Sequence, residues 1–249
     1  MAKKTEILKK SSERNIKPSG RVPLGIKDFD NLINGGFIKK STNLVVGRAG
    51  AGKTIFAIEF LVNGIINYGE PGVYITFEEK KEKLYNDMIE FGWDLKKLEN
   101  DGKFAFLEYT PEQVKKVLIE GGGIVESLIT KMKAKRIVID SISSFALLYQ
   151  DELTRKEAAL ALIALIDNWG CTAVLTSEET VIEYGNTIST ALEFEVDSII
   201  LLYYTKVKSA RVRAMEILKM RGTKHTNKTF EFSINENGMY VNPKKTVIL

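Results

Sequence analysis

Cysteine, histidine and long apolar runs are scarce in this sequence of 249 residues. Cys171 is its one cysteine, so no intramolecular disulfide can form. Its apolar surroundings, WGCTAVLTS, predict a small buried side chain rather than a nucleophile. No run approaches about 18 uninterrupted apolar residues, so we expect no transmembrane helix. The basic N-terminal segment lacks the apolar core of a signal peptide, which favours a cytoplasmic protein.

Charge is nearly balanced in total but unevenly distributed. The chain has 36 Lys and Arg against 32 Asp and Glu, a net charge of +4. Residues 1–21 alone hold seven Lys or Arg and two Glu, so the remainder is close to neutral. Hydrophobic residues at 44% and charged residues at 27% exclude wholesale disorder, a collagen-like chain and a disulfide scaffold. We predict a single domain over 21–249 after a basic tail over 1–20. The tail is either a solvated terminus or an anchor for nucleic acid or an acidic partner.

Short apolar runs alternate with helical patterns over most of the chain. The runs have the length and composition of buried strands, and the stretches between them have helical periodicity. The predicted strands are 44–46, 73–77, 104–107, 137–139 and 173–176, and the predicted helices are 53–68, 80–91, 124–133 and 155–169. This alternation predicts an α/β fold with a mainly parallel central sheet flanked by helices.

The pattern changes after residue 196. Four strand-like segments follow one another with turn residues between them, and Asn237-Gly238 is a hairpin signal. These segments are 198–204, 214–220, 230–234 and 239–241. We predict that they add antiparallel strands to one edge of the sheet.

A phosphate-binding P-loop pattern, G-x-x-x-x-G-K-[ST], occupies residues 47–54. Its glycines let the backbone curl so that several N–H groups point at phosphate oxygens, and the next helix presents its positive N-terminal end to the same anion. Lys53 can reach the β- and γ-phosphates, and the Thr54 hydroxyl can bind Mg²⁺. The predicted binding residues are Gly47, Ala49, Gly50, Ala51, Gly52, Lys53 and Thr54, with Lys53 also catalytic.

Acidic residues follow two other predicted strands. Asp140 ends one of them, and from a strand beside the P-loop it would hold Mg²⁺; the alternative is a turn or cap residue. Glu78 and Glu79 follow the strand 73–77, at the edge where parallel sheets bind ligands. Hydrolysis requires a group that orients or deprotonates water, so at least one of these glutamates is a candidate base. The alternative is that they open the next helix, where acids favour the N-terminal dipole.

Several segments occur in the order and spacing of a known family. They are Arg21–Ile26 with Asn31–Gly36, the P-loop, Thr76–Glu79, Val138–Ser141 and Glu216–His225. Together they resemble the KaiC-like ATPases of the RecA superfamily, from about residue 20 to the C-terminus. KaiC itself has two such modules in tandem, whereas this chain has one and resembles the single-domain KaiC-like proteins common in archaea.

The resemblance implies a RecA-like P-loop fold, ATP and Mg²⁺ as ligands, and a hexameric ring with ATP at subunit interfaces. It implies that Glu78 and Glu79 supply the catalytic base. The family's K-x-R-G-x-x-H segment reaches the neighbouring subunit's nucleotide, which maps onto Lys219, Arg221, Thr223 and His225. Residues two apart in a strand share a face, so Lys219 and Arg221 would project together toward a γ-phosphate. The alternatives are a solvated basic edge and, for His225, a hydrogen-bonded surface residue.

Three functions agree with these motifs. The first is a Mg²⁺-dependent, ring-forming ATPase that couples slow hydrolysis to an unidentified protein partner. The second is an ATP-sensing oligomerisation switch with little turnover. The third, a DNA-binding recombinase-type ATPase, is disfavoured because residues 178–196 contain glutamates but no Lys or Arg. Lys206, Lys208, Arg211 and Arg213 leave nucleic-acid contact open on another face.

Autokinase activity is not predicted. Ile188-Ser189-Thr190 has the letters of a family phosphorylation motif. Alignment of the segment from Asp197 with the corresponding family strand instead places Glu193 and Phe194 at the phosphorylated positions.

Overall fold

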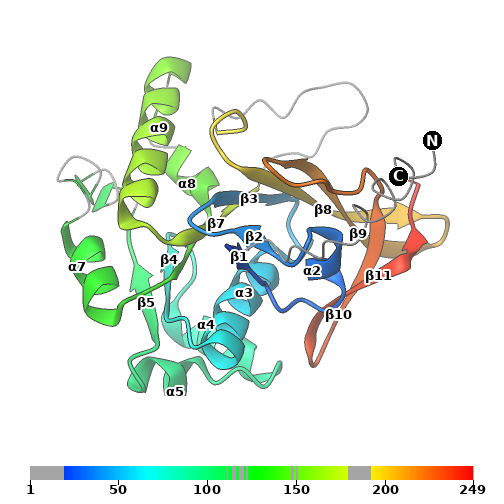
Figure 1. Ribbon diagram of the computed structural model, residues 1–249, viewed down its shortest axis with the longest axis horizontal. Coiled ribbons are helices and arrows are strands. Elements are labelled where there is room, and N and C mark those ends of the chain that lie inside the picture. Colours follow the sequence, from blue (N-terminus) through cyan, green and yellow to red (C-terminus); the bar gives the residue numbers. More distant parts are fainter. Residues whose placement is uncertain are drawn as a thin grey trace, which may run out of the picture.

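A mixed sheet of nine strands forms the centre of the molecule (Figure 1). The computed structural model describes residues 20–110, 112–113, 116–117, 121, 123–146, 149, 151–178 and 192–248. Across the sheet the strand order is β11-β10-β9-β8-β3-β7-β6-β4-β5. Their bounds are β3 Thr42–Gly47, β4 Gly72–Thr76, β5 Phe104–Glu108, β6 Arg136–Asp140, β7 Thr172–Ser177, β8 Ser198–Val207, β9 Ala210–Met220, β10 Phe230–Asn235 and β11 Gly238–Thr246.

The sheet is parallel from β8 to β5 and antiparallel from β8 through β9 and β10 to β11. This arrangement confirms the predicted α/β fold with antiparallel strands at the C-terminal edge. Asn237 and Gly238 lie in the tight connection between β10 and β11, where Asn235 pairs with Gly238, so the hairpin prediction is also confirmed.

Two predictions about strand neighbours need correction. β8 pairs antiparallel with β9, as expected, but its other edge pairs in parallel with β3, from Asn43↔Ser198 to Gly47↔Leu202. Its first five residues are buried, as in a central parallel strand. The strand that ends in Asp140, β6, was expected beside the P-loop strand, but β7 lies between β6 and β3. Local sequence does not encode strand order, so neither error was visible from the motifs.

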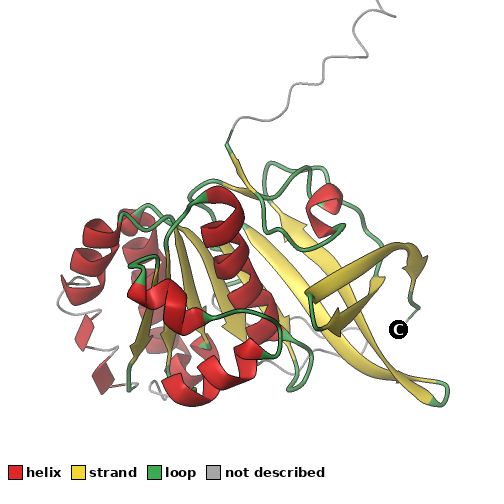
Figure 2. Cartoon of the chain, turned by 90° about the horizontal axis from the view of Figure 1, so that it is seen from below, coloured by secondary structure: helices red, strands yellow, loops and turns green. Residues whose placement is uncertain are grey.

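Helices cover both faces of the parallel strands (Figure 2). Alternate residues of each strand point to opposite faces, so the sheet separates two apolar clusters. One cluster lies under the long P-loop helix, α3, and the other lies under α7 and α9. The helices are α2 Phe29–Leu32, α3 Lys53–Tyr68, α4 Lys81–Ile89, α5 Leu95–Asn100, α7 Gly123–Met132, α8 Ile142–Ala146 and α9 Glu152–Trp169.

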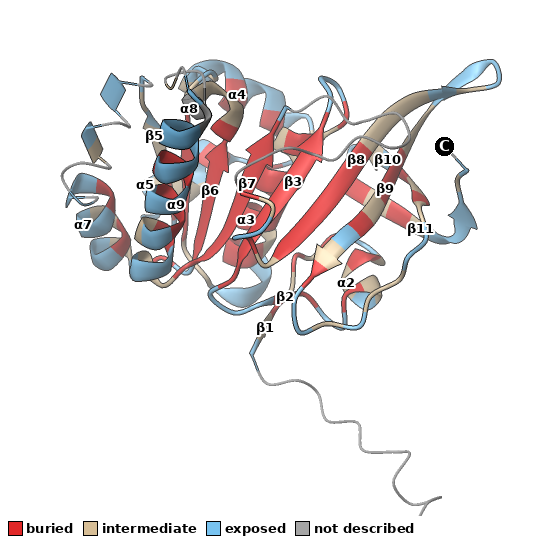
Figure 3. Cartoon of the chain, turned by 90° about the horizontal axis from the view of Figure 1, so that it is seen from above, coloured by how far each residue is buried: buried red, intermediate tan, exposed pale blue. Residues whose placement is uncertain are grey.

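The burial pattern explains why the parallel strands read as continuous apolar runs. Every residue of β3, β4, β6 and β7 is buried, as Figure 3 shows for the centre of the sheet. Cys171, directly before β7, is 1% exposed, and burial raises the pKa of its thiol to about 11. The prediction of an inert core cysteine is therefore confirmed. No helix in the part of the chain that the structure describes is long and apolar enough to cross a membrane.

Capping residues set helix bounds that periodicity alone places less well. The Asp151 carboxylate accepts a hydrogen bond from the Thr154 N–H at 2.9 Å, so α9 begins at Glu152 rather than at the predicted residue 155. Gly170 ends the same helix with φ 65°, a left-handed conformation that glycine adopts without strain. The short pair β1 Arg21–Val22 and β2 Phe37–Ile38, and helix α2, were not predicted because they are too short to show a period.

Candidate functional site

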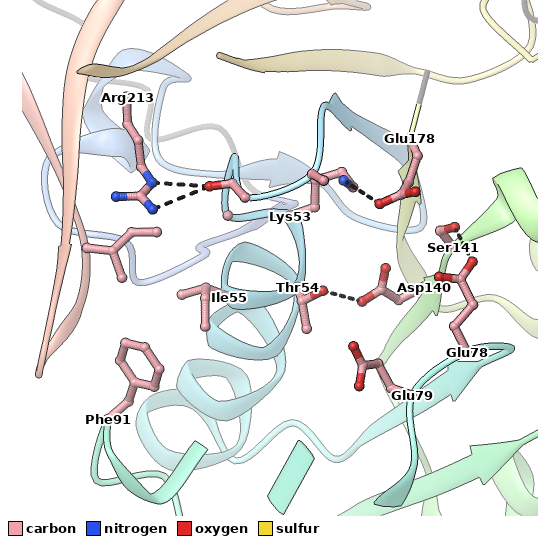
Figure 4. A pocket seen from close by; sticks show the side chains of 14 residues that line it. Lys53, Thr54, Ile55, Glu78, Glu79, Phe91, Asp140, Ser141, Glu178 and Arg213 are labelled. Carbon is pink, nitrogen blue, oxygen red and sulfur yellow. Dashed lines mark hydrogen bonds and ion pairs between the residues drawn. The ribbon is translucent and has the colours of Figure 1, made fainter. Parts of the chain in front are cut away.

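A cleft of about 420 Å³ opens at the carboxyl end of the parallel strands, above the N-terminus of α3 (Figure 4). Parallel sheets bind ligands at this edge because the connections that follow their strands gather there. The described residues that line the cleft are Ala49, Gly50, Gly52, Lys53, Thr54, Ile55, Glu78, Glu79, Phe91, Asp140, Ser141, Glu178, Arg213 and Ile234. The P-loop residues, both candidate bases and Asp140 are therefore brought together, as predicted.

The P-loop is shaped by glycines in left-handed conformations. Gly50 has φ 79° and Gly52 has φ 104°, values that other residues adopt only with strain. A Cβ on Gly47 would lie 2.6 Å from the Leu202 carbonyl oxygen, and one on Gly52 would lie 2.9 Å from side-chain atoms of Ile234. The loop thus approaches β8 and β10 too closely for side chains at these positions.

Lys53 is buried at the floor of the cleft, with 7% of its surface exposed. Its ammonium group donates to the carbonyl oxygens of Gly47 at 2.9 Å and Arg48 at 3.3 Å, and it pairs with the Glu178 carboxylate at 3.2 Å. The ammonium is therefore held inside the curve of the P-loop, where phosphate oxygens bind in this type of loop.

Asp140 collects hydroxyl donors from three elements. The hydroxyls of Thr54 and Tyr74 donate to its Oδ2 at 2.8 Å and 2.7 Å, and the Thr176 hydroxyl donates to its Oδ1. Burial, with the neighbouring Asp140 charge, raises the pKa of Tyr74 far above its usual range, so its phenol remains a donor. Thr54, in the first turn of α3 after β3, thus meets Asp140 at the end of β6, although β7 lies between β3 and β6 in the sheet.

Glu78 and Glu79 stand at the opposite wall of the cleft from the P-loop. Both backbone N–H groups are directed at the Thr76 hydroxyl, at 3.3 Å and 3.1 Å, which turns the chain out of β4. The Glu78 carboxylate accepts hydrogen bonds from the hydroxyls of Ser141, at 3.3 Å, and Ser144. Glu79 instead pairs with Lys83 at 3.5 Å on α4. The two carboxylates thus have different partners. Glu78 is held by hydroxyls of the segment that follows β6, and Glu79 by a lysine of α4.

The donor set of the cleft fits a nucleoside triphosphate with Mg²⁺. The close backbone approach at Gly47 and Gly52 leaves a cradle of main-chain groups in front of the Lys53 ammonium. Thr54 Oγ1 and Asp140 Oδ2 are oxygen ligands 2.8 Å apart, which is the chemistry that Mg²⁺ prefers. Among the described residues no group of three or more His, Cys, Asp or Glu is arranged to hold a metal ion by itself. Magnesium commonly shares its shell with substrate phosphates, so these two side chains suffice.

One side of the cleft is apolar. Ile55 and Phe91 lie on the side away from Asp140 (Figure 4), and Ile234 of β10 also lines the cleft. Arg213 of β9 reaches over this side and directs its guanidinium at the Gly50 carbonyl at 3.3 Å and 3.4 Å. The guanidinium also lies 4.5 Å from the centre of the Tyr204 ring. The antiparallel strands therefore supply part of the cleft wall.

The predicted trans-acting segment lies at the other end of the sheet. Lys219 pairs with Ile199 on β8, level with Leu44 of β3 and roughly 10 Å short of Gly47 along the strand direction. The segment 219–225 contributes nothing to the cleft within the described part of the chain. Its side chains contact main-chain groups instead: Thr223 donates to the Arg221 carbonyl at 3.3 Å, and His225 Nδ1 lies 2.9 Å from the Thr226 carbonyl.

Lys219, near the end of β9, and Arg221, directly after it, both contact the turn that precedes β8. The Lys219 ammonium donates to the carbonyl oxygens of Glu193 at 2.7 Å, Phe194 at 3.3 Å and Val196 at 2.7 Å. Arg221 donates to the carbonyls of Phe194 and Glu195, at 3.2 Å for the latter, and lies 3.6 Å from the Asp197 carboxylate. Met220, between them, is buried, which agrees with the predicted alternation. The motif at 188–190 lies outside the described residues.

Comparison with known proteins gives one consistent result. The family described as "ATPase: KaiC" matches residues 22–246. This chain belongs to the KaiC-like ATPases of the RecA superfamily. It is 35% identical over 225 residues to the circadian clock oscillator protein KaiC of Synechococcus elongatus, and 34% identical over 238 residues to the circadian clock protein KaiC3 of a Synechocystis species.

These relatives differ from the KaiC-like chain in length. The match covers 88% of this chain but 43% of the Synechococcus protein, and 92% against 47% for KaiC3. The chain thus spans less than half the length of the clock proteins it matches. A solved structure of a KaiC-like protein from Pyrococcus horikoshii is 37% identical with a TM-score of 0.78, and the match covers 90% of this chain and 99% of that one.

Several residues of the KaiC-like site were not singled out by sequence reasoning. Glu178 follows β7, Tyr74 and Thr176 lie inside strands, and Arg213 and Ile234 come from the antiparallel edge. A usable signal existed for Glu178, because it lies two residues after the predicted strand 173–176. Glu78 and Asp140 likewise come directly after predicted strands. The others carry no local signal, since only the strand order brings them to the cleft.

Proposed function

We propose that this KaiC-like chain binds ATP with Mg²⁺ and hydrolyses it slowly, in a homo-hexameric ring whose nucleotide sites lie between subunits. The supporting observation is a single cleft in which the Lys53 ammonium, the Thr54–Asp140 pair and the Glu78 carboxylate face one another. Residues 21–249 act in this proposal as one ATPase domain behind a basic tail.

Each side chain has a separate task in the proposed reaction. Lys53 and the main-chain N–H groups of the P-loop bind the phosphates, while Thr54 and Asp140 hold Mg²⁺. When bound, Mg²⁺ supplies charge neutralisation at the phosphates. Glu78 orients the attacking water and accepts its proton at a carboxylate oxygen. Ser141 and Ser144 fix the direction of that carboxylate. Glu79, held by Lys83, is the second candidate for the base.

The charge of the γ-phosphate is met from a second subunit. We assign this role to Arg221 and Lys219, with Thr223 and His225 as further contacts to the neighbour's nucleotide. Support comes from their distance from the P-loop of their own chain: the segment lies at the opposite end of β3 and β8. Cations that complete an active site from a neighbour are a known device in phosphoryl transfer.

One set of measurements tests the proposal. Phosphate release by the purified protein is followed with ATP, in Mg²⁺ and in EDTA, while light scattering gives its mass with and without ATP and Mg²⁺. We expect slow, Mg²⁺-dependent release and a mass that approaches that of a hexamer. A monomer at micromolar concentration with saturating ATP would reject the ring. No release, with ATP bound, would reject hydrolysis.

A second candidate is an ATP-dependent oligomerisation switch with little turnover. The observation that favours it is the engagement of Glu78 Oε1 by two serine hydroxyls, which compete with the attacking water for that carboxylate oxygen. In that case ATP would drive assembly, and Glu78→Gln would leave both assembly and the low basal rate unchanged.

Partners beyond ATP and further copies of the chain remain proposals. We expect a protein partner to be coupled to the nucleotide state, in a cytoplasmic protein. Nucleic acid is a weaker candidate, because its contacts would be limited to the basic tail and the β8–β9 hairpin with Lys206, Lys208, Arg211 and Arg213. Repeating the hydrolysis assay with DNA at two salt concentrations tests this: stimulation that fades with salt would support binding.

A further inference from the structure

Glu178 occupies a position in the cleft that the proposed reaction does not use. It directly follows β7, the strand between the P-loop strand β3 and the Asp140 strand β6. Its carboxylate reaches across to the Lys53 ammonium at 3.2 Å (Figure 4). A negatively charged side chain therefore lies against the cation that phosphate is expected to contact.

The Lys53 ammonium has no donor to spare in this arrangement. An ammonium group has three N–H donors. Here they face the carbonyls of Gly47 and Arg48 and the carboxylate of Glu178, at 2.9 Å, 3.3 Å and 3.2 Å. The two carbonyls belong to the P-loop itself. A phosphate oxygen can reach the ammonium only by replacing one of these acceptors, and Glu178 is the one that competes with full negative charge.

We propose that Glu178 is a positioning residue that competes with the terminal phosphate of the nucleotide for Lys53. This inference rests on the proposed ATP binding at the P-loop. In the empty site Glu178 holds the ammonium in place; in the loaded site a phosphate takes over that contact and repels the carboxylate. The Glu178 side chain is 48% exposed, so it can turn outward into solvent without disturbing packed residues.

The backbone of Glu178 is fixed while its side chain is not. Its N–H donates to the Ser143 hydroxyl on α8 at 2.6 Å, and that hydroxyl also contacts the Ser177 hydroxyl at 3.2 Å. The next residue of α8, Ser144, donates to Glu78. The backbone of Glu178 and the carboxylate of the candidate base Glu78 thus both contact α8, and exchange of partners at Lys53 needs only a rotation of the Glu178 side chain.

Equilibrium nucleotide binding tests the competition. Glu178→Gln keeps the size and hydrogen-bonding capacity of the side chain and removes its charge. Because the wild-type carboxylate must be displaced, we expect the variant to bind a non-hydrolysable ATP analogue with Mg²⁺ about fivefold more tightly. In ATP the terminal phosphate is the γ-phosphate, and this is the group that is proposed to displace Glu178. ADP lacks the γ-phosphate, so its affinity should gain less than about twofold. The ratio of the two affinities is a readout that a purely structural role would leave unchanged.

Two further variants guard the interpretation. Glu178→Ala removes both charge and contact, and it should also tighten binding of the ATP analogue. Glu108→Gln removes a carboxylate that pairs with Lys80 outside the cleft, so it should change neither affinity. Thermal unfolding of each variant confirms that it is folded before binding is measured.

The outcomes separate this inference from the proposed function. If the wild type binds no ATP analogue and Glu178→Gln binds none, ATP binding itself is wrong. If the wild type binds but Glu178→Gln binds equally or more weakly, the competition is wrong while ATP binding stands. An equal gain for ADP and for the ATP analogue would also overturn the assignment, because the competitor would then not be the γ-phosphate.

Discussion

The two ends of strands β3 and β8 hold cationic side chains in opposite settings. At the carboxyl end, Lys53 is buried and lies among carboxylates, in direct contact with Glu178 and in one cleft with Asp140 and Glu78. At the other end, Lys219 and Arg221 are held mainly by neutral main-chain carbonyls. Both ends contain carboxylates, but at the first the buried ammonium pairs with one directly, whereas at the second the hydrogen bonds of Lys219 go to main-chain carbonyls.

This difference indicates which ligand each end can accept. The carboxyl end needs added positive charge before it can hold a triphosphate, which is what bound Mg²⁺ provides. At the other end the hydrogen bonds of Lys219 and Arg221 go to main-chain carbonyls, while the carboxylates of Asp197, Glu195 and Glu193 lie near Lys219 and that of Asp197 lies 3.6 Å from Arg221. In the proposed ring, these two cations are the groups that this end offers to a phosphate in a neighbour's cleft. The proposal therefore pairs the two ends between copies, not within one.

The strongest way to break this comparison is to mix two inactive variants. Lys53→Ala destroys the cleft of its own subunit, and Arg221→Ala destroys the opposite end. In mixed rings, the intact cleft of an Arg221→Ala subunit can meet the intact Arg221 of a Lys53→Ala neighbour. At equal amounts, roughly a quarter of interfaces have this combination, so hydrolysis should return to about a quarter of the wild-type rate.

A second mixture provides the matched control. Lys53→Ala mixed with Glu78→Gln places both defects in the cleft. Every subunit of these mixed rings then has a defective cleft, so hydrolysis should stay absent. Exchange of subunits must be demonstrated first, by native mass spectrometry of isotope-labelled variants. No recovery in proven rings of Lys53→Ala with Arg221→Ala would refute action between subunits.

The second prediction separates binding from chemistry within the carboxyl end. Glu78→Gln removes the group that accepts the proton of water, but it leaves the Lys53 cradle intact. We expect hydrolysis to fall about 100-fold while affinity for ATP changes by less than about threefold. Phosphate release and equilibrium binding are the measurements. Glu79→Gln is the control, because Glu79 pairs with Lys83 and should matter less. Near-normal turnover in both variants would remove the base from this pair of residues.

What could be predicted from the sequence differs between the two ends in the same way. The P-loop, Asp140 and Glu78 each lie in a short segment where a strand and its connection are adjacent in the chain. Their meeting follows from one rule about parallel sheets. The order β3-β7-β6 could not be predicted, because pairing between distant segments depends on packing of whole strands rather than on local pattern.

The opposite end shows the limit more clearly. As alternation predicts, Lys219 and Arg221 contact the same turn while Met220 between them is buried, although β9 ends at Met220. Their acceptors, the carbonyls of Glu193 to Val196, carry no side-chain signal, so no motif could announce them. Arg213 and Ile234 enter the cleft only because β9 and β10 fold back beside β8. The proposed role of Lys219 and Arg221 at a neighbour's nucleotide came from the family resemblance alone.

A third prediction concerns a carboxyl group buried behind the cleft. Glu59 on α3 accepts a hydrogen bond from the Met239 N–H at 2.7 Å, which ties β11 to the P-loop helix. Burial raises the pKa of Glu59 to about 8, with Asp30 adding repulsion and hydrogen bonds from Met239 and Asn63 opposing the rise. The folded protein therefore keeps a proton that the unfolded chain releases above about pH 4.5, so stability falls as pH rises toward 8.

Glu59→Gln should flatten that dependence, because the amide cannot ionise and still offers an oxygen to Met239. Denaturant unfolding of both proteins from about pH 5.5 to 7.5 should show the wild type losing about 2.5 kcal/mol relative to the variant. Glu108→Gln, an exposed carboxylate on β5, serves as the control and should leave the slope unchanged. Parallel slopes for wild type and Glu59→Gln would mean that Glu59 ionises normally in the folded chain.

The smallest expected effect distinguishes the two cations at the far end. The three donors of Lys219 are used by three carbonyls, whereas Arg221 has five donors and fewer acceptors, so Arg221 is the freer to meet a phosphate. Lys219→Met should therefore loosen the turn before β8, at a cost of about 1 kcal/mol or less, because the partly exposed carbonyls can bond to water. Hydrogen exchange at the Glu195 and Val196 amides, which both bond to the Leu192 carbonyl at 3.0 Å, should become faster in Lys219→Met. Lys219→Arg should largely restore the slower exchange.

Hydrolysis by Lys219→Met should fall less than hydrolysis by Arg221→Ala. If Lys219→Met instead abolished hydrolysis while exchange stayed slow, Lys219 would be acting on phosphate. The assignment of Lys219 to the turn and of Arg221 to the phosphate would then be wrong.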